Sequence, residues 1–184
     1  MSSQPWVIHG EPVTLVSHPW CRINDYDVEF ANGVRQIRTV HEDGGGAGVL
    51  AVTDDDKVVL LDLPHFAVRA GNALVIPGGG LHQGRTPQES AQEELVEETG
   101  LVATKWEPIY PFHRFPTLSA NVMHLFYATG LRMDKEVEPD PNEVINEVVY
   151  LPFEQALTEV GGKITDAAAI IALLWLQTKH LRGE

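Results

Sequence analysis

The sequence predicts an α/β fold in which a mixed sheet lies between helical layers, preceded by a small antiparallel β unit. The length of 184 residues suits one domain with an appendage. Strand-like segments alternate with two long helix-like segments, an order that favours a layered sheet. The segments around Leu50 and Leu60 are apolar on both faces. Helices must therefore cover both sides of the sheet.

Charge and composition limit the class of protein. The chain has 26 acidic and 13 basic residues, a formal charge of −13. Nucleic-acid binders neutralise phosphates with clustered Lys and Arg, so this balance argues against long nucleic acid as a partner. No apolar run approaches the ~20 residues that a membrane helix needs, and the first residues lack the pattern of a secretory signal. We therefore expect a cytoplasmic protein without a membrane partner, and lone Cys21 fits a reducing compartment.

The first part of the chain, from Trp6 to Val40, consists of short β-prone pieces separated by turn residues. Asn32-Gly33 is the strongest hairpin signal in the chain. The glycine-rich segment 41–48 predicts a joint, which gives an N-terminal β unit at 1–44 and a second domain at 45–184. A detached unit of this size is too small to bury its own core, so we expect it to act as a dimerisation arm in a homodimer.

The second domain is predicted to hold buried strands and two main helices. The helices are expected at 87–99 and at about 166–180. The other segments are VLAVT, VVLLDL, ALVIP, LVATKWEPIY, NVMHLFYATGL and EVVYLP as strands, FEQALTEV as a short helix, and 133–143 as a loop.

The first of these helices carries signals at both ends. Thr86 is a natural N-cap, Pro87 fits the first helical position, and Glu89 completes a Thr-x-x-Glu capping box. Gly100 supplies a left-handed stop. The sequence therefore specifies this helix locally, whatever surrounds it.

Three carboxylates share one face of this helix. Glu94, Glu97 and Glu98 lie within an arc of about 100°. Like charges at this spacing repel one another unless cations lie against them, and Mg²⁺ prefers oxygen ligands of this kind. A glycine run, Gly78–Gly80, lets the backbone approach a ligand closely and could offer a carbonyl. The alternative is a solvated acidic face.

Residues 76–101 resemble the Nudix box, which reads Gly, five residues, Glu, seven residues, Arg-Glu-apolar-any-Glu-Glu-any-Gly-apolar. The matching positions are Gly79, Glu94, Leu95, Glu97, Glu98, Gly100 and Leu101. Two positions depart from the pattern, because Arg85 replaces the first Glu and Glu93 replaces the Arg. These departures are reciprocal, which predicts an ion pair with exchanged partners. A double reversal should then restore most of the stability lost in the single reversals.

The resemblance implies a Nudix-type α/β/α sandwich and Mg²⁺-dependent hydrolysis of a nucleoside diphosphate linked to another group, with Mn²⁺ as a possible substitute for Mg²⁺. Residues 47–180 are similar to the ADP-ribose pyrophosphatase branch, whose members also carry an N-terminal β unit that helps form a homodimer. That branch often has an Arg after the VLL strand and a Glu before the Pro-Gly turn, whereas this chain has Leu-Pro-His-Phe at 63–66 and Val75. ADP-ribose is the first choice of substrate, followed by another nucleoside diphosphate sugar.

The resemblance also assigns roles to residues. The expected metal ligands are Glu94, Glu98, Glu97 and a backbone carbonyl of Gly78 or Gly79. Glu143 is expected to be the catalytic carboxylate that orients or deprotonates water, because the family places such a Glu in this loop; Glu97 is a second catalytic candidate, and Glu147 and Glu138 are alternatives to Glu143.

Phosphate binding is expected to involve Arg114 and Arg69, which could bind bidentately, together with Gly79 and Gly80. Trp106, Phe112 and His113 could stack a base, although an aromatic residue in a strand more often belongs to the core. His65 and His82 are expected to be loop residues.

Two other functions remain open on sequence alone. A non-catalytic nucleotide-sugar sensor could use the same fold, but such a sensor would not need to keep a self-repelling acidic cluster. A nucleoside triphosphate hydrolase of the same family is another alternative, but it would not need residues 1–40 as a dimer arm.

Overall fold

The computed structural model describes residues 4–19, 21–42, 44–69, 71–134 and 144–183. The chain divides into two compact units. The first comprises Met1–Gly45 together with His113–Val122, and the second comprises Gly46–Phe112 together with Met123–Glu184.

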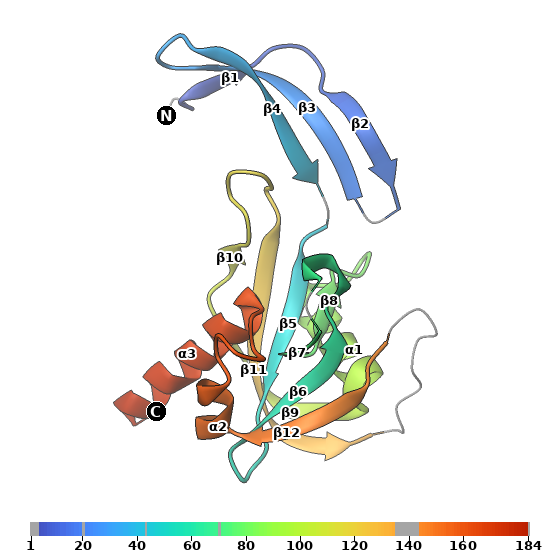
Figure 1. Ribbon diagram of the computed structural model, residues 1–184, viewed down its shortest axis with the longest axis vertical. Coiled ribbons are helices and arrows are strands. Elements are labelled where there is room, and N and C mark those ends of the chain that lie inside the picture. Colours follow the sequence, from blue (N-terminus) through green and yellow to red (C-terminus); the bar gives the residue numbers. More distant parts are fainter. Residues whose placement is uncertain (1–3, 20, 43, 70, 135–143, 184) are drawn as a thin grey trace. The chain divides into compact units, whose positions relative to one another are not determined.

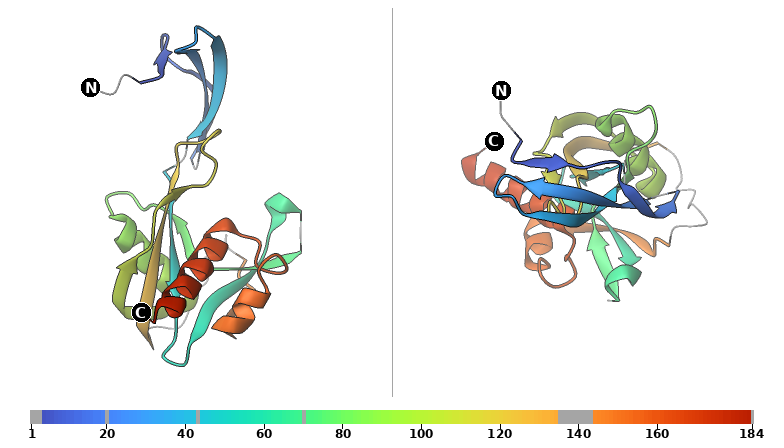
Figure 2. Two further views of the ribbon diagram at one scale, coloured as in Figure 1. Left: turned by 90° about the vertical axis from the view of Figure 1, so that its left-hand side faces the viewer. Right: turned by 90° about the horizontal axis from the view of Figure 1, so that it is seen from above.

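The first unit is a four-stranded antiparallel sheet (Figure 2). Its strands are β1 (Trp6–Ile8), β2 (Val13–His18), β3 (Cys21–Phe30) and β4 (Arg35–Glu42). Strand β3 pairs with all three others. The predicted Asn32-Gly33 turn is confirmed between β3 and β4, where Gly33 has a φ of 80° and the Asn32 side chain accepts a hydrogen bond from the backbone N–H of Val34.

A later segment also belongs to the first unit. The backbone N–H of His41 donates to the carbonyl of Leu118 at 2.8 Å, and His41 forms a β-bridge with Ser119. No local pattern predicts that 113–122 would pair with this sheet, because the contact spans more than 70 residues.

The remaining strands are β5 (Gly46–Ala51), β6 (Lys57–Pro64), β7 (Asn72–Val75), β8 (Gly78–Gly80), β9 (Leu101–Pro108), β10 (Phe112–His113), β11 (Val122–Met133) and β12 (Glu147–Pro152). One sheet has the order β10-β11-β5-β8, with β9 also paired to β11, and the other has the order β12-β6-β7. Strands β5 and β11 pair in parallel, whereas β5–β8 and β9–β11 are antiparallel. The expectation of a mixed sheet is therefore confirmed.

The helices are α1 (Pro87–Thr99), α2 (Phe153–Thr158) and α3 (Ala167–Arg182), with a 3₁₀ turn, η1 (Phe66–Val68), between β6 and β7. Alternate residues of β5 point to opposite layers. Val49 packs in the cluster that contains Leu95 of α1, and Leu50 packs in the cluster that contains Leu173 of α3. Figure 1 shows α1 and α3 on opposite sides of β5. This arrangement confirms the predicted α/β/α sandwich.

The glycine-rich joint is shorter than expected. Strand β4 continues to Glu42 and β5 starts at Gly46, so the last three residues of the predicted joint, 46–48, lie in a strand. Ala47 and Gly48 are buried between neighbouring strands, which leaves little room for larger side chains. Of the helices in the described ranges, none is both long enough and apolar enough to cross a membrane.

Candidate functional site

Helix α1 begins and ends where the sequence predicts. The Thr86 hydroxyl accepts a hydrogen bond from the backbone N–H of Glu89 at 3.2 Å, and the Glu89 carboxylate accepts one from the backbone N–H of Thr86 at 2.8 Å. This backbone hydrogen bond lowers the pKa of Glu89. Gly100 ends the helix with a φ of 71°. The caps fix the register of the helix and therefore the direction of its acidic side chains.

The glycine run meets two of these side chains. The backbone N–H of Gly78 donates to Oε2 of Glu98 at 2.7 Å. A Cβ at Gly79 would lie 2.2 Å from Oε1 of Glu94, so this carboxylate packs directly on the backbone of Gly79. A charged group accepting a backbone hydrogen bond is held more strongly than a neutral one. Consequently, the glycine run fixes the Glu98 carboxylate and adjoins the Glu94 carboxylate.

The three acids of the helix differ in burial. Glu94 and Glu98 are each only 7% exposed, whereas Glu97 is exposed. Glu97 instead lines a pocket of about 390 Å³ on the outer side of α1, together with Arg85, Glu89, Gln92, Glu93 and Val96. Burying a carboxylate is unfavourable unless hydrogen bonds or cations compensate for the lost water. Burial therefore makes Glu94 and Glu98 the carboxylates of α1 that a bound cation would stabilise most.

His82 joins two carboxylates of α1. Its Nδ1 lies 2.6 Å from Oε2 of Glu93, and its Nε2 lies 3.2 Å from Oε1 of Glu94. The hydrogen bond to Glu93 raises the pKa of the imidazole, and the contact with Glu94 adds to the increase. The predicted ion pair is present, because a guanidinium nitrogen of Arg85 lies 2.8 Å from Oε1 of Glu93. Glu93 thus faces two basic side chains.

The donor set suits a hard divalent cation. Two buried carboxylates, those of Glu94 and Glu98, lie beside the glycine strand β8. Oxygen atoms are the ligands that Mg²⁺ prefers. Over the residues that the structure describes, no three His, Cys, Asp or Glu side chains converge as a metal site. Glu94 and Glu98 would therefore be the main protein ligands of such a cation. The roles of Glu97 and of the Gly78 carbonyl as ligands stay predictions.

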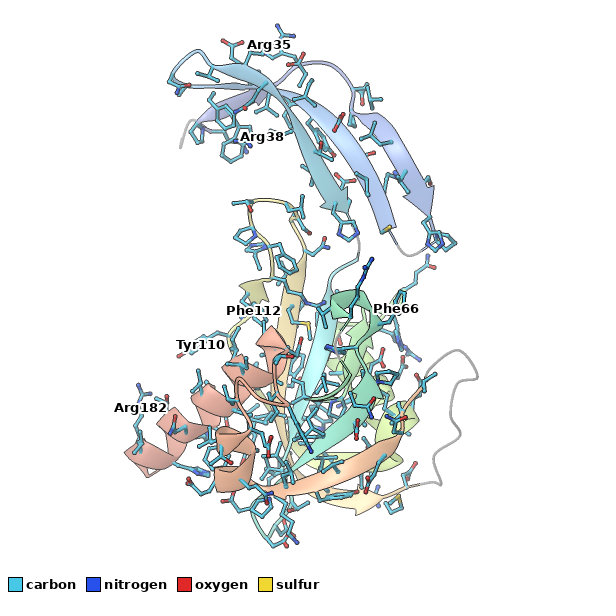
Figure 3. The ribbon with its side chains drawn as sticks, in the orientation of Figure 1. Arg35, Arg38, Phe66, Tyr110, Phe112 and Arg182 are labelled. Carbon is cyan, nitrogen blue, oxygen red and sulfur yellow. The ribbon has the colours of Figure 1, made fainter. Side chains whose placement is uncertain are left out.

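The other predicted residues lie elsewhere. Arg69 is exposed and directly follows η1, which begins at the exposed Phe66 labelled in Figure 3. Arg114 is exposed and belongs to the first unit. Gly80 ends β8 beside Gly79. Glu143 lies outside the described residues, as does the alternative Glu138, so its role also stays a prediction.

The candidate base-stacking residues mostly serve the core. Trp106 donates its indole N–H to the carbonyl of Ala103 at 3.1 Å, and its ring meets Phe126 edge-on. Phe112 packs against the buried cluster that includes Leu173 of α3. The expectation that a strand aromatic is usually a core residue therefore holds for both.

His82 makes more contacts than its sequence position predicts, since that position indicates only an ordinary loop histidine. One feature of the sequence does point to these contacts. Two basic residues, His82 and Arg85, precede Glu93, the acid that replaces the Arg of the motif. Only the folded loop shows that both of them reach Glu93.

This geometry changes the expected outcome of charge reversal. Arg85→Glu and Glu93→Arg should each lower the free energy of unfolding by about 0.5 to 1 kcal/mol, since Arg85 and Glu93 are only partly shielded from water. In the double variant the pair attracts again, but His82 then faces a guanidinium. We therefore expect about half of the loss to return, measured by urea unfolding of all four proteins. A coupling energy of zero would mean that the contact contributes nothing to stability.

Comparison with known proteins agrees with this geometry. The NUDIX domain family matches residues 43–173. An ADP-ribose pyrophosphatase of Bacillus subtilis (strain 168) is 34% identical over 157 residues, which cover 84% of this chain and 83% of that protein. A GDP-mannose pyrophosphatase of Yersinia enterocolitica (serotype O:8 / biotype 1B) is 29% identical over 180 residues, covering 91% and 93%. A crystal structure of an ADP compounds hydrolase superposes with a TM-score of 0.81 at 23% identity, covering 100% and 97%, and supports the fold.

Proposed function

Since this chain belongs to the Nudix family of pyrophosphohydrolases, we propose that its substrate is ADP-ribose, which it hydrolyses to AMP and ribose 5-phosphate with Mg²⁺. The observation that carries this proposal is the pair of buried carboxylates, Glu94 and Glu98, held against the glycine run. Burying a carboxylate is unfavourable unless hydrogen bonds or cations compensate for the lost water, and the family resemblance assigns metal binding to these two motif positions.

Different residues are proposed to have different roles in hydrolysis. Glu94 and Glu98 would hold the cation, and the missing side chain at Gly79 makes room for the Glu94 carboxylate. At such a site, Mg²⁺ would neutralise the charge of the diphosphate and activate a water molecule for attack on phosphorus. Arg69 and Arg114 are proposed to bind phosphate oxygens, for which a planar guanidinium is well suited.

Glu143 is proposed as the carboxylate that orients or deprotonates the attacking water. We expect Glu143→Gln to reduce turnover strongly, by about 100-fold, and to leave KM nearly unchanged, because the amide keeps the size of the side chain but cannot take up a proton. Steady-state kinetics on both parameters checks this. Glu154→Gln is the control, because it makes the same chemical change at an exposed position of α2 that has no proposed role. Glu143 would instead be a binding residue if KM rose sharply while turnover held.

The choice of substrate is tested by a panel of nucleoside diphosphate sugars and nucleoside triphosphates, each incubated with Mg²⁺ and analysed for phosphate-containing products. ADP-ribose should give the highest kcat/KM, with AMP and ribose 5-phosphate in equal amounts. The relatives include GDP-mannose pyrophosphatases at about 30% identity, which makes GDP-mannose the second candidate. Higher kcat/KM for GDP-mannose would replace ADP-ribose, and preference for a triphosphate would reject both.

We further propose that the first unit forms a homodimer. Of its described hydrophobic residues, Val28 alone is buried. The exposed large ones within residues 6–37 are Trp6, Val7, Ile8, Val13, Leu15, Val16, Val34 and Ile37. So many exposed apolar side chains on one small sheet are typical of a protein interface. Sedimentation equilibrium at micromolar concentration should therefore give twice the mass of one chain, whereas a monomer would contradict the proposal.

A further inference from the structure

We propose that His82 is a positioning residue that orients the Glu94 carboxylate for cation binding. The inference rests on the proposed function, since it takes Glu94 as a metal ligand. It adds a residue outside the acidic set that the motif provides.

The ring of His82 is fixed at both of its nitrogens. Nε2 contacts Oε1 of Glu94 at 3.2 Å, and Nδ1 contacts Oε2 of Glu93 at 2.6 Å. An ionised carboxylate only accepts hydrogen bonds, so a ring nitrogen that bonds to one does so as the donor. The backbone of His82 is also anchored, because its N–H donates to Oγ of the buried Ser90 at 3.0 Å. His82 is therefore held to α1 by three separate contacts, two through its ring and one through its backbone.

The same Glu94 oxygen also adjoins the backbone. Oε1 of Glu94 is the atom that a Cβ at Gly79 would meet at 2.2 Å. It therefore adjoins both the imidazole of His82 and the glycine run. A glutamate has three side-chain torsions, and contacts to one carboxylate oxygen restrict how the whole group can turn. Holding one oxygen in this way sets the direction of the carboxylate before a cation arrives.

Burial shows where the contact matters most. Along the chain of contacts the side chains are 52% exposed at Arg85, about one third exposed at Glu93 and His82, and 9% exposed at Glu94. Hydrogen bonds weaken least where water is excluded. The Nε2 contact at the buried end is therefore the functional one, and the Arg85–Glu93 pair supports the ring from the water-exposed side.

Two substitutions separate the ring nitrogens. The amide nitrogen of a glutamine can take the place of Nε2, whereas that of an asparagine can take the place of Nδ1. His82→Gln thus keeps a donor toward Glu94, and His82→Asn keeps one toward Glu93. His65→Ala is the matched control for His82→Ala, because His65 is a loop histidine of the same unit and outside the proposed site.

The test is titration of the substrate-free protein with Mn²⁺ by calorimetry, alongside thermal unfolding of each variant. Changes to residues that orient a metal ligand typically weaken metal affinity by about 10- to 100-fold. We expect a weakening of at least about 10-fold for His82→Ala and His82→Asn, substantial recovery for His82→Gln, and wild-type affinity for His65→Ala. Unfolding midpoints should stay close to wild type.

The outcomes distinguish this proposal from the proposed function. If Glu94→Gln abolishes Mn²⁺ binding while His82→Ala retains wild-type affinity, the metal site stands and the role of His82 is overturned. If His82→Asn binds normally and His82→Gln does not, the contact with Glu93 is the one that matters and the proposal also fails. If Glu94→Gln binds Mn²⁺ as tightly as wild type, the metal assignment itself is wrong and the proposal falls with it.

Discussion

Replacing Glu98 with Gln is expected to lower turnover by at least about 100-fold while the protein stays folded. Oε2 of Glu98 accepts a hydrogen bond from the backbone N–H of Gly78 at 2.7 Å, and an amide oxygen can accept the same bond. The side chain is 7% exposed, so an amide of equal size should fill the same space. What the substitution removes is the negative charge that holds a divalent cation.

The measurement is turnover at saturating Mg²⁺, with circular dichroism and thermal unfolding as checks on the fold. Glu154→Gln is the control, because it makes the same chemical change at an exposed position of α2 and should leave turnover unchanged. Near-normal turnover of a folded Glu98→Gln protein would remove Glu98 from the metal site. A loss of turnover accompanied by unfolding would mean that its contact with Gly78 is structural.

Local signals account for the parts of the fold that the sequence predicted well. The caps at Thr86 and Gly100 are satisfied by residues within four positions, so they depend little on the rest of the chain. The same holds for the Asn32-Gly33 turn and for Asp166, whose carboxylate caps α3 through the backbone N–H of Ala169. By contrast, residues 113–122 join the first unit through contacts with distant β4, which no local pattern encodes.

Helix geometry also explains why the sequence could not rank the acids. At about 100° per residue, Glu98 lies about 40° to one side of Glu94, and Glu97 lies about 60° to the other. The helical pattern puts all three on one broad face, but the rotation of α1 against the sheet decides which two are buried. The apolar anchors Ala91 and Leu95 fix that rotation, and it leaves Glu97 exposed.

Replacement by alanine should have different effects at the two adjacent glycines, Gly78 and Gly79. A Cβ at Gly78 would lie 2.4 Å from the carbonyl oxygen of Ala47 and 2.7 Å from Cα of Gly48, and its φ of +154° is one that other residues rarely adopt. These obstacles are backbone atoms of a buried strand, so β5 or β8 would have to move. Backbone strain and overpacking each contribute about 1 to 3 kcal/mol. Gly78→Ala should therefore lower the free energy of unfolding by about 2 to 6 kcal/mol.

At Gly79 the obstacle is instead the end of a flexible side chain. A Cβ there would lie 2.2 Å from Oε1 of Glu94, and the carboxylate can rotate away. We expect Gly79→Ala to change the free energy of unfolding by less than about 1 kcal/mol, yet to lower turnover by about 100-fold, since a displacement of about 1 Å in a catalytic group can have that effect. Urea unfolding and Mg²⁺-dependent kinetics on both variants check the pair. If Gly79→Ala kept full turnover, the position of the Glu94 carboxylate against the glycine run would have no role in catalysis, because the added methyl group must displace it.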